Sequence, residues 1–458
     1  MKLKYLYQIT LFISTVLLIR CQQKANVLEH KDSFSYSITF DETNPKLAKI
    51  KASFVPKDST LYMWWGASNL PKRWATFVHN LKVTNDKSGK SIKIEELEDA
   101  KWKMYTSLDN RITVNYEVHL DHEEHKWSSG IDAVAYSTDL GIFYTGRTLL
   151  ILNGEERRNV NVTFNLPKTW KVTTPWSLKD TQKNIYVANN ISDLATALIF
   201  AGTHKEISLK REKFELVFAL GSKDILAQEE EFKDLAQGVL DYFIELMGGV
   251  PNPSPDSPFH KSVVVINSSD KYKTDGEAIG NNISVLIEKK GDKLSKTISR
   301  FIFAHEFFHL WNGKSFSPTN EDTEWFKEGF TNYYTIKALH HIGFLNDDSY
   351  LDFLGDFFYG RYDIDDGVGK LSMANGSVKH EHWGLVYAGG MFVGIAQDII
   401  IRSATNNQKS IDDLMKGLYT KYGGTNKSYN LDELKSSITK LSGIDQTEFF
   451  NSYVLGIK

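Results

Sequence analysis

The 458-residue sequence contains one cysteine, Cys21, so no disulfide can form within a single chain. Its stability must therefore come from packing and from any bound metal. There are only 10 prolines and no low-complexity runs, which argues against long disordered linkers. The net charge is only −3, and no block of Lys or Arg occurs. A nucleic-acid partner is therefore not expected.

Core-forming residues, in contrast, are plentiful. Hydrophobic residues make up 41% of the sequence and aromatic residues 13%, as in an aromatic-rich globular protein. A chain of 458 residues exceeds the size at which one hydrophobic core usually keeps growing. We therefore expect about two or three domains.

The N-terminal segment has the composition of an export signal. Two lysines precede the apolar run Leu6–Ile19, which has the length of a signal-peptide core and is short for a membrane span. Cys21 follows, in a context that resembles a bacterial lipoprotein signal, although Arg20 stands where that pattern has a small residue. We expect residues 1–21 to be a signal peptide. The protein would then be exported, as a periplasmic, outer-membrane or cell-surface lipoprotein attached to the membrane through lipidated Cys21, or else secreted.

The next part of the sequence reads as short strands. Period-two alternation at Ser35–Thr39, Ala48–Val55 and Arg111–Val118 predicts strands and, over residues 27–215, an antiparallel β-sandwich. The aromatic and glycine-containing stretch Ile131–Gly146 is expected to be a sandwich edge or a loop. Three histidines near residue 122 lie in an acidic segment and favour a surface cluster over a second metal site.

From Ile225 the apolar residues recur at helical spacing, which indicates a second domain over residues 225–345 and a helical region over 346–458. Between the first helices lie two predicted strands, Ser262–Ile266 and Ile283–Ile287. We expect the second of these to be an edge strand, where an extended peptide could pair.

The chemistry concentrates in residues 303–334, FAHEFFHLWNGKSFSPTNEDTEWFKEGFTNYY. His305 and His309 are one helical turn apart and point the same way to within about 40°. Two imidazoles on one helix face suit a catalytic zinc site, with Glu306 as general base. Such a site needs a third ligand and one open position, and Glu328 on the following helix is the candidate. The alternative is a buried, hydrogen-bonded histidine pair.

The flanking residues resemble a known family. Eighteen residues separate His309 from Glu328, and the stretches HLWN, from His309, and EGFTNYY, from Glu328, resemble the gluzincin metallopeptidases and, more narrowly, the M61 glycyl aminopeptidase family. The resemblance implies a multidomain β plus α/β fold. Its parts would be an N-terminal antiparallel β-sandwich, a thermolysin-like catalytic domain and a C-terminal α-helical region.

The resemblance also implies roles for individual residues. One Zn²⁺ per chain would be held by His305, His309 and Glu328. Glu306 would take a proton from the attacking water and deliver it to the leaving amine. Tyr387, in the segment VYAGGM, resembles the tyrosine that stabilises the oxyanion in gluzincins. Asn332, one turn beyond Glu328, could orient a ligand, or could be a solvated amide.

Three departures from the family pattern qualify the substrate. Members commonly carry a PDZ domain after the catalytic region, whereas this sequence ends at Lys458, where one would begin. Two serines replace the arginines that tend to follow the Trp-Asn-x-Lys segment. In the loop GEAIGNN, Ile279 occupies the place of the glutamate that binds the substrate amine in gluzincin aminopeptidases. Glu277 lies on the same strand face and could substitute, flanked by Gly276 and Ala278 as candidate substrate-binding residues.

These observations predict an exported zinc metallopeptidase, most simply an aminopeptidase acting on short peptides with small N-terminal residues. Ile279 keeps a zinc endopeptidase or a hydrolase of blocked peptides as the alternative. A surface peptide- or glycan-binding protein with a structural metal is a third reading, and the intact base Glu306 argues against it.

Overall fold

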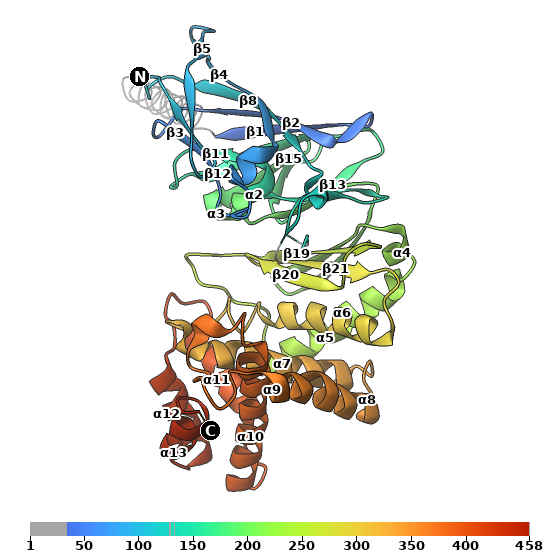
Figure 1. Cartoon of the computed structure of the whole chain (residues 1–458), viewed down its shortest axis with the longest axis vertical. Coiled ribbons are helices and arrows are strands. Elements are labelled where there is room, and N and C mark those ends of the chain that lie inside the picture. The colour runs from blue at the N-terminus through green and yellow to red at the C-terminus, as the bar shows by residue number, and fades with distance from the viewer. Residues whose placement is uncertain (1–33, 128–129, 132, 458) are drawn as a thin grey trace, which may run out of the picture. The chain divides into compact units, whose positions relative to one another are not determined.

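The computed structural model describes residues 34–127, 130–131 and 133–457 (Figure 1). The expected signal peptide and Cys21 lie outside these residues. The chain forms two compact units, the first ending at Thr203 and the second beginning at His204.

The first unit is built almost entirely from strands, which form three sheets with the orders β14-β15-β12-β1-β2-β8-β4-β5, β13-β16-β10-β9 and β11-β3-β7-β6. Its elements are β1 (Ser35–Asp41), β2 (Asn44–Phe54), β3 (Thr60–Met63), η1 (Arg73–Phe77), β4 (Val78–Asn85), β5 (Ser91–Ile92), β6 (Ile94–Leu97), β7 (Lys101–Met104), β8 (Ile112–His119), η2 (His122–Glu124), β9 (Tyr136–Ser137), β10 (Gly141–Thr145), α2 (Gly146–Leu149), β11 (Ile151–Leu152), β12 (Arg158–Asn165), β13 (Lys171–Thr173), β14 (Ser177–Asp180), β15 (Ile185–Asn190), α3 (Ile191–Ala195) and β16 (Leu198–Gly202).

Alternation of buried and exposed side chains explains why these segments are strands. In β1, Tyr36, Ile38 and Phe40 are buried and their neighbours are not. Pairing is antiparallel throughout the large sheet except between β1 and β12, which run parallel. The predicted antiparallel-rich β architecture is confirmed, and the Gly141–Thr145 part of the expected loop or edge is an inner strand, β10, between β9 and β16.

The first compact unit ends earlier than the boundary expected at residue 215. Strands β17 (Lys205–Arg211) and β18 (Phe214–Leu220) pair with each other, and β18 pairs in parallel with β19 (Lys261–Ser269), so both belong to the second unit. Alternation along a strand shows that it has one buried face but does not show which sheet that strand joins. The residues on either side of the division expected at 345/346 lie in the same compact unit, which begins at His204.

The second unit has one five-stranded sheet, ordered β17-β18-β19-β21-β20, and a set of helices. Its remaining elements are α4 (Lys223–Leu226), α5 (Glu229–Met247), β20 (Asp275–Ile279), β21 (Asn282–Glu288), α6 (Lys293–Phe308), η3 (Glu321–Thr323), α7 (Glu324–His341), α8 (Asp347–Asp352), η4 (Phe353–Tyr359), α9 (Gly360–Ile364), η5 (Gly376–Val378), η6 (Gly384–Ala388), α10 (Gly389–Ala404), α11 (Ile411–Tyr422), α12 (Leu431–Ser442) and α13 (Thr447–Tyr453).

The edge of this sheet differs from expectation. Residues 275–279, which the sequence suggests are a loop, form β20, and this strand is the edge in place of residues 283–287. Strand β21, which holds residues 283–287, is buried between β19 and β20. A short strand containing glycine and carboxylates carries a weak strand signal, which explains the difference.

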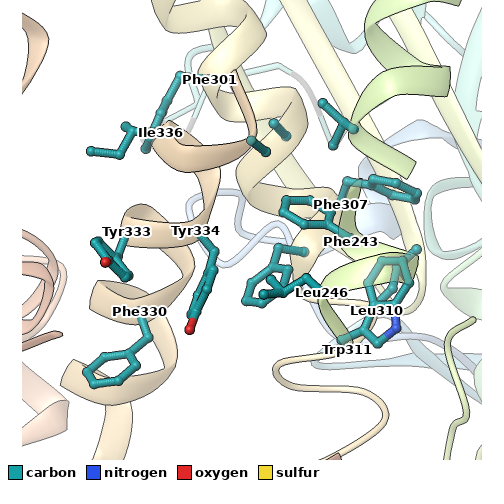
Figure 2. Close-up of a cluster of buried hydrophobic side chains, with 14 of the residues drawn as sticks. Phe243, Leu246, Phe301, Phe307, Leu310, Trp311, Phe330, Tyr333, Tyr334 and Ile336 are labelled. Carbon is teal, nitrogen blue, oxygen red and sulfur yellow. The ribbon is translucent and has the colours of Figure 1, made fainter. Parts of the chain in front are cut away.

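Helices α6 and α7 carry the motif and pack on a shared aromatic core. Asp292 caps α6, accepting a hydrogen bond from the Ser295 N–H, so the helix begins at Lys293. Figure 2 shows Phe243 of α5 near Phe307 of α6, and Tyr334 of α7 facing the same cluster. Helix α7 is buried along most of its length, so it is the central helix of the unit.

Two segments of the second unit are π-helical, η4 and η6, and each continues directly into an α-helix. Among the described residues, the stretch Gly384–Ala404, formed by η6 and α10, is long and apolar enough to cross a membrane. About two-thirds of it, 67%, is buried inside the protein, as expected of a core helix.

Helix α10 approaches α7 backbone to backbone. A Cβ on Gly329 would lie 2.2 Å from the carbonyl carbon of Gly390, and a Cβ on Gly390 would lie 2.1 Å from the Trp325 oxygen. Both distances are far inside van der Waals contact, so only glycine fits at either position. Because Glu328 precedes Gly329, and Tyr387 lies just before Gly390, this contact fixes how close the two can come.

We therefore predict that Gly329→Ala destabilises the protein by about 2–4 kcal/mol, because the added methyl group meets backbone that cannot rotate away. Urea unfolding monitored by fluorescence measures the change. Gly417→Ala on α11 is the matched control: its Cβ would have no neighbour within 4 Å, and we expect it to be neutral or to stabilise by up to about 1 kcal/mol. Equal effects of the two substitutions would contradict the close contact.

His122 is not a surface residue, contrary to expectation. It is 0% exposed, stacks on Phe77 with ring centres 3.7 Å apart, and its Nε2–H donates to the His119 carbonyl at 3.0 Å. Its Nδ1 accepts the Ala135 N–H at 3.3 Å, so the ring is neutral and both nitrogens are used. Burial lowers the pKa of His122 to about 3.

This burial makes stability depend on pH. Between about pH 6.5 and 3 the unfolded chain binds a proton at residue 122 that the folded chain does not, so stability falls with decreasing pH by roughly 1.4 kcal/mol per pH unit. We predict that His122→Gln, although destabilising at pH 7, loses less stability than the wild type between pH 7 and 5. Urea midpoints at each pH measure this, with exposed His79→Gln as the control. Parallel pH profiles for wild type and His122→Gln would contradict it.

Candidate metal centre and active site

Three side chains from two helices converge on one point. Helix α6 carries His305, and His309 caps its C-terminal end. Their Nε2 atoms are 3.1 Å apart. From α7, Glu328 Oε2 lies 3.3 Å from His305 Nε2 and 3.2 Å from His309 Nε2. The three residues predicted as metal ligands are thus brought together.

The spacing of these donors suits a small metal ion. Four ligands at the zinc distance of about 2.0 Å define a tetrahedron with edges of about 3.3 Å, close to the separations of 3.1, 3.2 and 3.3 Å between the three atoms. His309 Nδ1 donates to the Asn312 carbonyl at 2.9 Å, which leaves the lone pair of Nε2 pointing at the other donors. Three acceptor atoms directed at one point repel each other, and a cation bound between them would relieve that repulsion.

Asn312 joins the two helices that supply the ligands. Its carbonyl holds the His309 ring, while its Nδ2 donates to the Lys327 carbonyl at 3.0 Å and to Thr331 Oγ1 at 3.2 Å. One buried residue on the turn after α6 therefore contacts both groups, with its backbone carbonyl on the His309 ring and its side-chain amide on α7. The two side-chain hydrogen bonds to α7 explain why an asparagine stands at this position of the HLWN stretch.

The second oxygen of Glu328 is held by two lysines. Lys327 and Lys379 each lie 3.3 Å from Oε1, and both also pair with Glu324 one turn earlier on α7. Burial opposes ionisation of Glu328, but attraction to His309, and then to Lys327, holds its pKa well below the usual range. The carboxylate is therefore charged and oriented. No local pattern in the sequence points to Lys379, which is 51 residues away from Glu328.

A cavity of about 380 Å³ opens beside these groups and is lined by His305, Glu306 and Tyr387, among others. Burial, followed by the nearby negative charges of Glu328 and Glu277, raises the pKa of Glu306 to about 7, although His305 opposes the shift. A carboxyl group with such a pKa can accept and return a proton near neutral pH. Glu306 thus has the place and the proton affinity of a general base.

Tyr387 comes from the π-helical segment η6. Its ring stacks on Trp383, with centres 5.2 Å apart and planes at 8°, and lies 6.3 Å from the His305 ring. Burial and the charges of Glu328 and Glu306 raise the pKa of Tyr387, so its hydroxyl keeps its proton. It can therefore donate a hydrogen bond into the cavity.

Asn332 acts on a different partner from the one expected. Its Nδ2 donates to the Tyr387 carbonyl at 3.1 Å, and within the described residues this is its only side-chain hydrogen bond. It is fully buried, so it is not the solvated amide that the sequence allowed. Asn332 ties α7 to η6 and does not orient His305, His309 or Glu328.

Strand β20 borders the same cavity. Asp275 and Gly276 line it, whereas Ile279 is only 5% exposed and packs in the core. The charge of Glu277 contributes to the raised pKa of Glu306, so the two carboxylates lie near each other. Ala278 pairs with Ile283 in the sheet and contributes backbone to this strand.

A second group of potential ligands consists of Asp365, Asp366 and His382. Hydrogen bonds within the protein already account for the position of Asp365. Asp365 accepts hydrogen bonds from His382 Nδ1 at 2.9 Å and from the Leu385 N–H at 3.0 Å. It thereby caps the helical turn that leads to Tyr387. Neither this cap nor Trp383 has a recognisable sequence signal.

Comparison with known proteins gives a consistent assignment. The family model described as the peptidase M61 N-terminal domain matches residues 35–203, and the one described as M61 glycyl aminopeptidase matches residues 299–411. No curated protein matches the chain. Among solved structures, an aminopeptidase N family protein from Idiomarina loihiensis has a TM-score of 0.76 at 19% identity, over 93% of this chain and 76% of that one.

At this identity the structural likeness shows the fold alone, and it agrees with the two-unit architecture described above. The two family models span more than half of the chain and cover both the strand-rich unit and the helices that carry the converging histidines and glutamate. The chain belongs to the M61 peptidase family and is a peptidase.

Proposed function

We propose that the protein is a zinc-dependent aminopeptidase that removes N-terminal residues from short peptides. The observation that carries this proposal is the convergence of His305, His309 and Glu328 beside a cavity lined by Glu306 and Tyr387. Three donors with near-equal separations suit one zinc ion, and the cavity leaves room for a peptide on one side.

Each residue then has a defined task. Zinc, when bound, supplies positive charge that polarises the scissile carbonyl and acidifies water. Glu306 accepts a proton from the attacking water and passes it to the leaving amine. The Tyr387 hydroxyl donates to the carbonyl oxygen as that atom gains negative charge. The lysine pair on Glu328 Oε1 keeps the other carboxylate oxygen directed at the histidines.

Glu277 is the proposed anchor for the substrate amine. Ile279, buried in the core, cannot hold an ammonium group, whereas Glu277 lies close enough to Glu306 to influence its pKa. Gly276 and Ala278 belong to the edge strand β20, whose backbone can pair with an extended peptide. The alternative, a zinc endopeptidase or a hydrolase of blocked peptides, would need no anchor.

Comparing free and N-acetylated substrates separates these two activities. We predict that alanine p-nitroanilide is hydrolysed at least about 100-fold faster than its N-acetyl derivative, because the acetyl group removes the charge that Glu277 binds. Glu277→Gln should lower kcat/KM for the free substrate and not for the acetylated one. Equal rates on both substrates would show that the enzyme is not an aminopeptidase.

Replacing Glu306 by glutamine, which has nearly the same shape but cannot accept a proton, tests its role as the general base. We predict that Glu306→Gln lowers kcat by about 10²–10⁴-fold, while zinc, measured by atomic absorption, stays at one per chain. His305→Ala is the comparison, since loss of a ligand should lower the zinc content as well. If Glu306→Gln retains full activity with zinc bound, this residue is not the base.

We further propose that the protein is exported and attached to a membrane through lipidated Cys21. The support is the sequence alone: an apolar run of signal-peptide length followed by a single cysteine. We predict that Cys21→Ala moves the protein from the membrane fraction to the soluble exported fraction of a bacterial host. Arg20→Ala, which restores a small residue before the cysteine, should keep it membrane-bound. Identical fractionation of Cys21→Ala and wild type would contradict lipidation.

A further inference from the structure

The arginines of the second unit are used in two different ways. The unit contains four, and three are paired with a carboxylate: Arg211 with Asp241 at 2.7 Å, Arg300 with Glu231 at 2.7 Å and Arg402 with Asp398 at 2.9 Å. Arg361 is the exception, because no carboxylate among the described residues lies within 4.0 Å of its guanidinium group. An arginine without a carboxylate partner within the described residues is available to bind an anionic group from outside the chain.

Arg361 lines the cavity that holds the catalytic groups. Arg361 is the second residue of α9, the helix that continues the π-helical segment η4. It lines the cavity together with His305, Glu306 and Tyr387. Its side chain is solvent-exposed, so a ligand can reach it from solution. The guanidinium is therefore present where a substrate would lie.

Two aromatic rings hold the guanidinium in place. Its central carbon lies 3.7 Å from the centre of the Phe357 ring and 5.3 Å from that of Trp383, and Trp383 stacks in turn on Tyr387. Packing on rings fixes the plane of the group and leaves its N–H edges free for a planar acceptor. Within the described residues its one hydrogen bond, to the Phe357 carbonyl, is long at 3.4 Å.

The side chains that line the cavity carry charges of both signs. Asp275 and Glu306 line it, with Glu277 nearby, while Arg361 is its one cationic lining side chain among the described residues. Asp352 and Asp356 line an adjoining cavity together with Arg361 but form no ion pair with it. Partial desolvation of the guanidinium against the two rings lowers the pKa of Arg361, although the residue is exposed at its edge, and no carboxylate offsets this effect.

We propose that Arg361 binds a carboxylate of the peptide substrate, and so sets a preference for substrates that carry negative charge beyond the N-terminal amine. The inference rests on the proposed peptidase function and names its substrate class. The carboxylate can come from the C-terminus of a very short peptide or from an acidic side chain, since both offer two coplanar oxygens to the guanidinium fork. A cavity lined by carboxylates and by a guanidinium matches a zwitterionic peptide.

Binding to the Glu306→Gln variant tests this without turnover. Calorimetry would compare Ala-Ala with Ala-Ala amide, which differ in the terminal carboxylate, and Ala-Glu amide with Ala-Gln amide, which differ in the side chain. We expect the acid of at least one pair to bind about tenfold more tightly than its neutral partner. The pair that shows the preference identifies the source of the carboxylate.

Substitution of Arg361 assigns the preference to this residue. Arg361→Met in the Glu306→Gln background should bring the Kd ratio of the preferred pair to about 1, and Arg361→Lys should leave an intermediate ratio, because lysine keeps the charge but loses the fork. Lys416→Met, an exposed lysine on α11, is the control for loss of one positive charge and should keep the ratio.

No preference in either pair, or a preference that Arg361→Met and Arg361→Lys both leave intact, would overturn the proposal. The thermal midpoint of each variant checks that it is folded. If the acids bind preferentially while the wild type with zinc releases no N-terminal residue from any peptide, the aminopeptidase proposal fails and the carboxylate site stands.

Discussion

The approach of α7 to α10 is the constraint on which the active site depends. Gly329 and Gly390 let the two backbones touch, and any larger residue at either position would push them apart. The residue before Gly329 is a candidate metal ligand, and the segment before Gly390 carries Tyr387. The separation of the Glu328 carboxylate and the Tyr387 hydroxyl is therefore constrained by a main-chain contact between the two helices.

Around this contact the protein has buried an unusual number of charges. Glu328 is shared between two histidines on one side and two lysines on the other, and Glu324 links the lysines. Buried charges are costly unless each has a partner of opposite sign, and here every carboxylate in the chain of contacts has at least one. The network keeps Glu328 ionised and fixed in direction, which a metal ligand needs.

The sequence predicted the contacts between residues that lie close together in the chain. It did not predict those between residues far apart in the chain. One helical turn separates His305 from His309, and Glu328 lies on the next α-helix of the chain. The spacing of the three residues therefore predicted that they converge. Lys379 and Arg361 reach the site through folds of the chain that leave no periodic signal. The same limit applied to the fold: strands were found from their alternation, but the sheet to which β17 belongs was not.

The π-helical segment η4 ends two residues before Arg361. One extra residue in an α-helix would rotate everything after it by about 100°, whereas a π-turn holds one residue more than an α-turn and takes up that rotation. Loss of one residue from η4 could therefore restore an ordinary α-helix and leave the guanidinium in the cavity. Chains of this fold could thus differ in length by one residue here and still place an arginine in the cavity, and an alignment made by residue spacing alone would miss the shared arginine.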